Sequence, residues 1–88
     1  MRVPLGYTIT ATTNANFRAG AIYVEVHNNS VTASLSILFA GADGSNNIVL
    51  KPGQIRVFPL LGSQGYAAFT LFNPLGGVVN DAFVLIIN

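Results

Sequence analysis

The chain has 88 residues, of which 51% are hydrophobic and 8% are charged, and its net charge is +1. Its four basic residues are scattered, so no basic cluster is available to bind a nucleic-acid phosphate backbone. Cys is absent and there is one His, which excludes disulfides and argues against a structural zinc site.

Runs rich in β-branched and aromatic residues, bounded by Gly, Pro, Asn, Asp and Ser, predict about seven short strands. They are expected at Tyr7–Thr13, Ala21–His27, Val31–Phe39, Ile48–Leu50, Ile55–Leu60, Tyr66–Phe72 and from Val79 or Ala82 to Ile87. Residues 14–20 are expected to be a loop in which Phe17 plugs one end of the core. No helical period is present, so the sequence predicts a single small antiparallel β-sandwich, either Ig-like or jelly-roll-like.

The second and third of these strands show the clearest alternation of apolar and polar side chains. The register of the second strand turns Tyr23, Glu25 and His27 outward, opposite to its Ile and Val residues. Between the two strands, residues 28–30 read Asn-Asn-Ser, which is typical of a turn. We therefore expect a hairpin between Ala21–His27 and Val31–Phe39.

The outward aromatic residues have two interpretations. Tyr23, Phe58, Tyr66 and Phe72 are expected to alternate outward, where they form either a platform for stacking sugars or a subunit interface. Their neighbours are mostly apolar, whereas sugar sites add polar and acidic groups, so the interface is favoured. We assign Phe58, Tyr66 and Phe72 to it.

The last strand has no polar face. Phe83, Leu85 and Ile87 point one way, and the alternating small and branched residues between them point the other. Both sides must therefore be covered, one by the opposing sheet and the other by a partner, or by a loop if the strand is central in a barrel. We assign Phe83, Leu85 and Ile87 as the main interface residues.

The inventory of catalytic groups is small, with three acidic residues and one His. Glu25 and His27 share a strand face, but no Ser or Thr is singled out as a nucleophile for them. Asp43 and Asp81 fall in predicted loops and suit turns, whereas a glycosidase needs two carboxylates close together. We expect no enzymatic activity, no metal site and no cofactor.

The composition predicts that the chain associates. We expect one domain, residues 1–88, with residues 1–6 as a candidate N-terminal arm. A surface with so few charges is poorly solvated, so copies of the chain or another protein should cover part of it. No run resembles a secretion signal or a membrane span, which requires about 18 apolar residues, so we expect neither secretion nor a membrane partner. The Asn-Asn-Ser sequence matches a glycosylation pattern only by chance.

The segment 48–60, IVLKPGQIRVFPL, joins a strand, a Lys-Pro-Gly turn and a second apolar strand. With the Asn-Asn-Ser turn before it, the chain resembles the small β-sandwich decoration or cement proteins of tailed bacteriophage capsids. The resemblance implies a non-enzymatic virion protein, made in the host cytoplasm, that stabilises the capsid lattice through apolar contacts between subunits and forms homo-oligomers. The alternative is a carbohydrate- or receptor-binding β-sandwich module that uses the outward aromatic residues.

Overall fold

The computed structural model describes residues 2–43, 47–62 and 64–88. Within these ranges the chain forms eight strands and no helix, so no helical membrane span is found there. The strands are β1 (Pro4–Ile9), β2 (Asn14–Phe17), β3 (Tyr23–Asn28), β4 (Leu35–Phe39), β5 (Ile48–Leu50), β6 (Ile55–Phe58), β7 (Phe69–Phe72) and β8 (Ala82–Ile87). All of their pairings are antiparallel, and the predicted all-β sandwich is confirmed.

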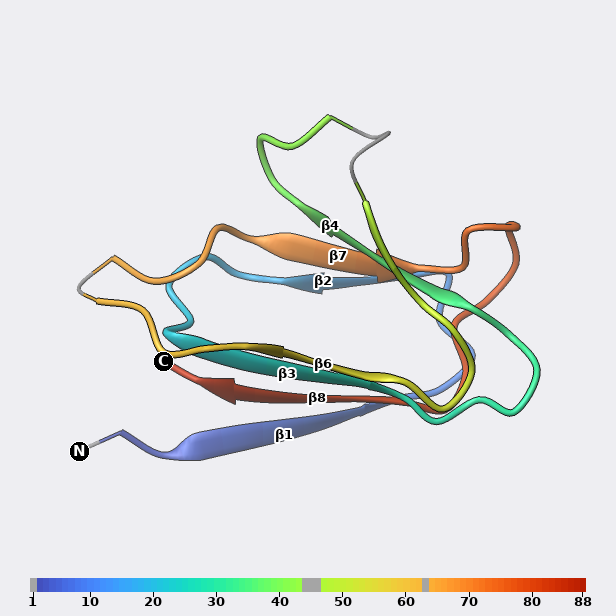
Figure 1. Ribbon diagram of the computed structural model, residues 1–88, viewed down its shortest axis with the longest axis horizontal. Helices are drawn as coiled ribbons and strands as arrows, with labels where there is room; N and C mark the ends of the chain where they lie inside the picture. The colour runs from blue at the N-terminus through green and yellow to red at the C-terminus, as the bar shows by residue number, and fades with distance from the viewer. Residues whose placement is uncertain (1, 44–46, 63) are drawn as a thin grey trace.

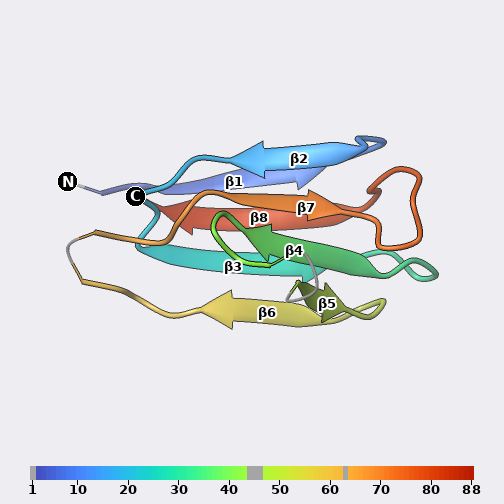
Figure 2. The same ribbon diagram turned by 90° about the horizontal axis from the view of Figure 1, so that it is seen from above.

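The strands form two four-stranded sheets, in the orders β1-β8-β3-β6 and β2-β7-β4-β5, stacked face to face (Figures 1 and 2). β1 pairs with β8, β2 with β7, β3 with β6 and β4 with β5, as in one long hairpin. Pairing of β3 with β8 and of β4 with β7 then rolls this hairpin into two layers. This arrangement of eight strands is a jelly roll, one of the two topologies expected.

The predicted hairpin between residues 21–27 and 31–39 is wrong, because β3 and β4 lie in opposite sheets. The buried side chain of Asn28 stabilises the crossover. Its Nδ2 donates to the carbonyl oxygens of Ala33 at 2.9 Å and Leu50 at 3.1 Å, and its Oδ1 accepts from the amide of Ser30 at 3.2 Å. With its amide engaged in this way, Asn28 is also unsuited to carry a glycan.

The N-terminal strands also differ from the prediction. Met1 lies outside the described residues, but Pro4–Gly6, expected in an arm, belong to β1 and pair with β8. β1 ends at Ile9 instead of Thr13, and Ala11 beyond it has a φ of 48°, a left-handed conformation that does not continue a strand. Residues 14–17, expected in a loop, form β2.

The core lies between the sheets and contains the inward side chains of all eight strands, together with Ala21 and Val79. The ring of Phe17 stacks on that of Phe69 with centroids 4.9 Å apart, so Phe17 is part of the core and not a loop plug. Phe58, expected to face outward, is only 8% exposed and contacts the ring of Phe39 at 5.2 Å. It faces inward because β6 pairs with β3 in the register Val24 to Phe58.

Candidate functional site

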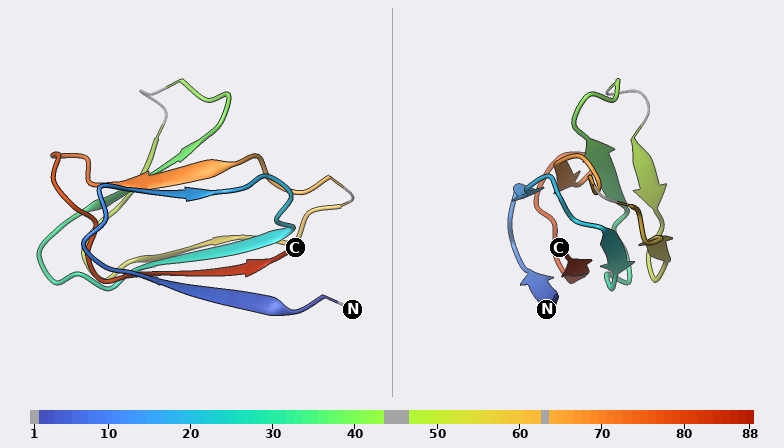
Figure 3. Two further views of the ribbon diagram at one scale, coloured as in Figure 1. Left: turned by 180° about the vertical axis from the view of Figure 1, so that it is seen from behind. Right: turned by 90° about the vertical axis from the view of Figure 1, so that its left-hand side faces the viewer.

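The outer face of the β1-β8-β3-β6 sheet is the candidate site, and we call it the β8 face. The strand registers place eleven residues on it: Pro4, Gly6, Thr8, Tyr23, Glu25, His27, Ile55, Val57, Phe83, Leu85 and Ile87. No other element of the described chain lies over this face (Figures 1 and 3). In the single chain the β8 face is therefore open to solvent, and its side chains are shielded only by one another.

The row along β8 consists of Phe83, Leu85 and Ile87, which point outward as the alternation predicts and are half-buried. Their partial burial comes from neighbours within the same sheet. Phe83 lies over Gly6, where an added Cβ would be 2.9 Å from the ring, and its ring contacts that of His27 edge-on at 5.6 Å. This lateral packing produces a smooth apolar surface without a second layer.

The opposite flank of the β8 face is also apolar. Ile55 is 56% exposed and Val57 is 46% exposed, and they occupy the two outward positions of the edge strand β6. The sequence prediction missed both of them, because it placed Phe58 on the outer side, and Ile55 and Val57 point to the side opposite Phe58. In the structure the side chain of Arg56 leaves the strand on the inner side of the sheet. Because β6 is at the sheet edge, this side chain still reaches solvent, and its guanidinium lies 5.8 Å from the centre of the Phe58 ring.

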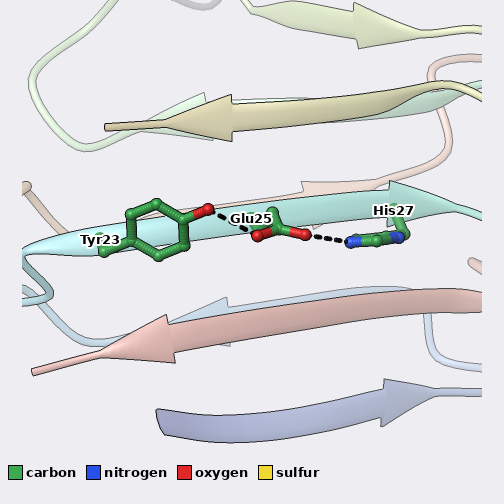
Figure 4. Close-up of polar contacts among 3 residues, drawn as sticks. All are labelled: Tyr23, Glu25 and His27. Atoms are coloured by element: carbon green, nitrogen blue, oxygen red, sulfur yellow. Dashed lines mark hydrogen bonds and ion pairs between the residues drawn. The ribbon is translucent and has the colours of Figure 1, made fainter. Parts of the chain in front are cut away.

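A polar row along β3 runs between these two apolar flanks (Figure 4). The Tyr23 hydroxyl donates to Glu25 Oε2 at 2.6 Å, and His27 Nε2 lies 2.8 Å from Glu25 Oε1. The hydrogen bond from Tyr23, followed by that from His27, lowers the pKa of Glu25 below its ordinary value, and the bond to Glu25 raises the pKa of Tyr23. The predicted acid–histidine pair therefore exists.

This row has the geometry of a satisfied polar cluster. Both oxygens of Glu25 already accept hydrogen bonds, and its lowered pKa makes it a poor base. The facing residues on the adjacent strands are apolar, with Phe83 opposite His27 and Val57 opposite Glu25. Among the described residues no group of three potential metal ligands occurs.

The second predicted patch does not form. Phe58 is in the core, and Tyr66 packs beside it with ring centroids 5.9 Å apart while its hydroxyl donates to the carbonyl of Pro59. Phe72 lies on the outer face of the other sheet, opposite Ser36 of β4. The structure thus brings Phe83, Leu85 and Ile87 together on one face, whereas Phe58 and Tyr66 pack at the core and Phe72 lies on the outer face of the other sheet.

No family model matches the chain, and neither a curated protein nor a solved structure matches it. The β8 face and the jelly-roll topology are therefore the observations that bear on function. Of the two, the topology is shared by proteins with many functions, whereas the face depends on the outward residues of this sequence.

Proposed function

We propose that this chain is a non-enzymatic assembly protein that docks through the β8 face, and that it serves as a virion component that decorates and stabilises a capsid lattice. The observation that supports docking is the pair of apolar rows, Phe83-Leu85-Ile87 and Ile55-Val57, on a sheet face that no described element covers. Exposed apolar patches on small proteins commonly mark interaction sites.

The composition of the face favours contact with protein. Its one ionised carboxylate, Glu25, already accepts hydrogen bonds from Tyr23 and His27, so a covering partner leaves no unpaired acceptor there. Covering the apolar flanks then contributes the burial term, about 25 cal/mol for each Å² of apolar area.

The size of the face favours docking in many copies. Three of its strands have six residues and β6 has four. With strands about 4.8 Å apart and about 3.4 Å for each residue, they span roughly 350 Å², less than half of what each partner buries in an ordinary interface. A single contact of this size is weak, and an array of copies on a lattice multiplies its effect.

The virion role is supported by the topology together with the resemblance to phage decoration proteins. Jelly rolls occur in capsid proteins and also in lectins and cupins, so topology alone does not choose among them. A sugar-binding module would need its aromatic residues on one surface, but Tyr23 is on the β8 face with its hydroxyl engaged, and Tyr66 packs against the core. Glycan-array binding that is lost in Tyr23→Ala would reverse this preference.

The virion role is tested by looking for the chain on virus particles. Particles from cultures that express the chain are purified on a density gradient and labelled with an antibody raised against it. We expect the chain to sediment with the particles and the label to appear on their outer surface. A chain found only in the free-protein fractions would refute the virion role.

The docking face is tested by adding purified variants back to particles that lack the chain. Leu85→Asp places an unpaired charge in the centre of the contact and should weaken binding at least 100-fold, which corresponds to about 2.7 kcal/mol. Asn16→Asp is the matched control, because it adds the same charge to an exposed position on the other sheet. Equal binding by the two variants would show that docking uses a different surface.

A further inference from the structure

The free edge of β1 differs from the other sheet edges in its lack of protection. Charged residues, prolines and short length normally keep an edge strand from pairing with another chain. β6 carries Arg56 and is followed by Pro59, β2 has four residues and is followed by Arg18, and β5 has three residues. β1 has six residues, no charge and a proline only at its first position.

A groove runs beside this edge, between β1 and β2, with a volume of about 780 Å³. Tyr7, Ile9, Phe17 and Ile86 contribute its apolar lining. Leu5 and Tyr7 point toward the inner side of the sheet, yet they are 40% and 42% exposed. The core is therefore open along β1, and the opening is next to a strand edge that no described strand pairs with.

We propose that a second copy of this chain pairs with this edge, β1 to β1 and antiparallel, about a two-fold axis. The proposal rests on the proposed function only in using the same sheet. Pro4 has no N–H to donate, so the pairing segment is Leu5–Ile9, centred on Tyr7. In that register Leu5 lies opposite Ile9 of the partner subunit, and Gly6 lies opposite Thr8 of the partner subunit.

In this register inward side chains lie opposite inward side chains, outward ones lie opposite outward ones, and the paired segment contains no charged residue. Its inward pairs are Leu5 with the partner subunit's Ile9 and Tyr7 with the partner subunit's Tyr7, so aliphatic and aromatic side chains enter the two open grooves. No like charges meet along it. The same pairing through β6 would bring Arg56 of both copies to one edge, which is why β1 is the edge we choose.

The pairing also enlarges the area that the β8 face offers to a docking partner. A single copy offers roughly 350 Å², but two sheets joined at β1 form one eight-stranded sheet whose outer face spans about 700 Å². That is close to the area, about 800 Å², that each partner contributes to an ordinary stable interface. The occupant that completes the open edge is thus a second copy that extends the docking surface.

Disulfide trapping tests the register, because the chain has no Cys of its own. Residues opposite each other on antiparallel strands have Cα atoms about 4.5–5.5 Å apart, a distance that a disulfide spans. Tyr7→Cys should therefore form a covalent dimer on mild oxidation, whereas Val57→Cys, outward on β6, should not. Failure of Tyr7→Cys to cross-link more than Val57→Cys while the variant remains folded would overturn the register.

A pair of lysine variants tests the pairing of the β1 edge while leaving Tyr7, at the two-fold axis, unchanged. Leu5→Lys puts a charge in the pairing strand at an already exposed position, and we expect at least 10-fold weaker dimerisation by analytical ultracentrifugation. Val57→Lys, the control, should keep the dimer and lose binding to particles. A dimer that dissociates in the Val57→Lys variant but persists in the Leu5→Lys variant would refute edge pairing. An unmodified dimer that fails to bind particles would refute only the docking function.

Discussion

The two outer faces of this sandwich differ in what they offer to a partner. The β8 face has two apolar rows around one hydrogen-bonded polar row. The outer face of the β2-β7-β4-β5 sheet, seen from above in Figure 2, has exposed Asn14 and Asn16 along β2, and Asn16 Oδ1 accepts a hydrogen bond from the Thr70 hydroxyl at 2.8 Å. The β2 side of that face is polar, and Leu38, Val49 and Phe72 are its outward apolar residues, so the β8 face has the larger apolar share of the two.

The comparison shows that a chain with few charges can still give its two sides different roles. Both sheets have four antiparallel strands, and both contribute to the same core. The difference comes from the outward positions. On the β2-β7-β4-β5 sheet, polar residues share the outer face with a few apolar ones: Asn14, Asn16, Ser36 and Thr70 with Leu38, Val49 and Phe72. On the β8 face, Phe83, Leu85, Ile87, Ile55 and Val57 form two continuous apolar rows. Function in such a fold is decided by residues that the core does not require.

The largest expected effect is a difference in the free energy of unfolding between a variant in the core and a variant on the β8 face. Phe69 is 1% exposed and stacks on Phe17, so Phe69→Ala should lower the free energy of unfolding by about 3–5 kcal/mol. Phe83→Ala removes the same ring from the half-buried face and should cost about 1 kcal/mol. Urea denaturation measures both. Equal losses would mean that the β8 face belongs to the folding core and is not a surface reserved for docking.

The next effect concerns two serines with opposite environments. Ser36, on the outer side of β4, is fully buried, and its hydroxyl has no hydrogen-bond partner among the described residues. Ser36→Ala should therefore raise the stability by about 1 kcal/mol. Ser30 Oγ accepts from the amides of Thr32 and Ala33, so Ser30→Ala should lower it by about 1–2 kcal/mol. Thermal unfolding that moves both variants in one direction would contradict this assignment.

A smaller effect is expected at the glycine beneath Phe83. Gly6→Ala introduces a methyl group 2.9 Å from the end of the Phe83 ring, which must turn away. Because the ring is at the surface, we expect a loss of about 1 kcal/mol or less in stability, together with a larger loss of particle binding as the β8 face becomes uneven. Binding as strong as that of the unmodified chain would show that the position of Phe83 is unimportant for docking.

The smallest effect is a pH dependence of the polar row. The pKa of Glu25 is lower in the folded chain than its ordinary value of 4.5, so its stabilising contribution is complete above that value and is lost as the pH falls through the folded pKa. The difference in unfolding free energy between the unmodified chain and Glu25→Gln should therefore shrink below about pH 4.5. A difference that is constant from pH 7 to pH 3 would show that Tyr23 and His27 do not stabilise the carboxylate.

The sequence was sufficient for the local features. Alternation correctly grouped the rows Tyr23-Glu25-His27 and Phe83-Leu85-Ile87, because both strands are in the middle of their sheet and their inward residues are apolar apart from Asn28 at the end of β3. The edge strands were harder. At the edge, the side chain of Arg56 is on the inner side of the sheet and is still exposed, so exposure along β6 does not indicate which side Phe58, two residues away, faces.

The assignment of strands to sheets could not be predicted from local patterns. A turn sequence at 28–30 is compatible with a hairpin or with a crossover, and the difference depends on the buried Asn28 amide reaching Leu50, far along the chain. β2 escaped prediction because two of its four residues are Asn, which usually indicates a loop. The groove along β1 depends on where β2 ends, so it could not be predicted either.

The pairing of β1 with β8 affects the order in which the protein can fold. β8 lies between β1 and β3, so that sheet has a gap until residues 82–87 have emerged from the ribosome. Until then β1 has no partner strand in its sheet and β3 pairs only with β6, whereas the pairings of the second sheet, β2-β7-β4-β5, do not depend on β8. Such long-range pairing predicts slow folding, and the nascent chain has most to gain from a chaperone while β8 has not yet emerged.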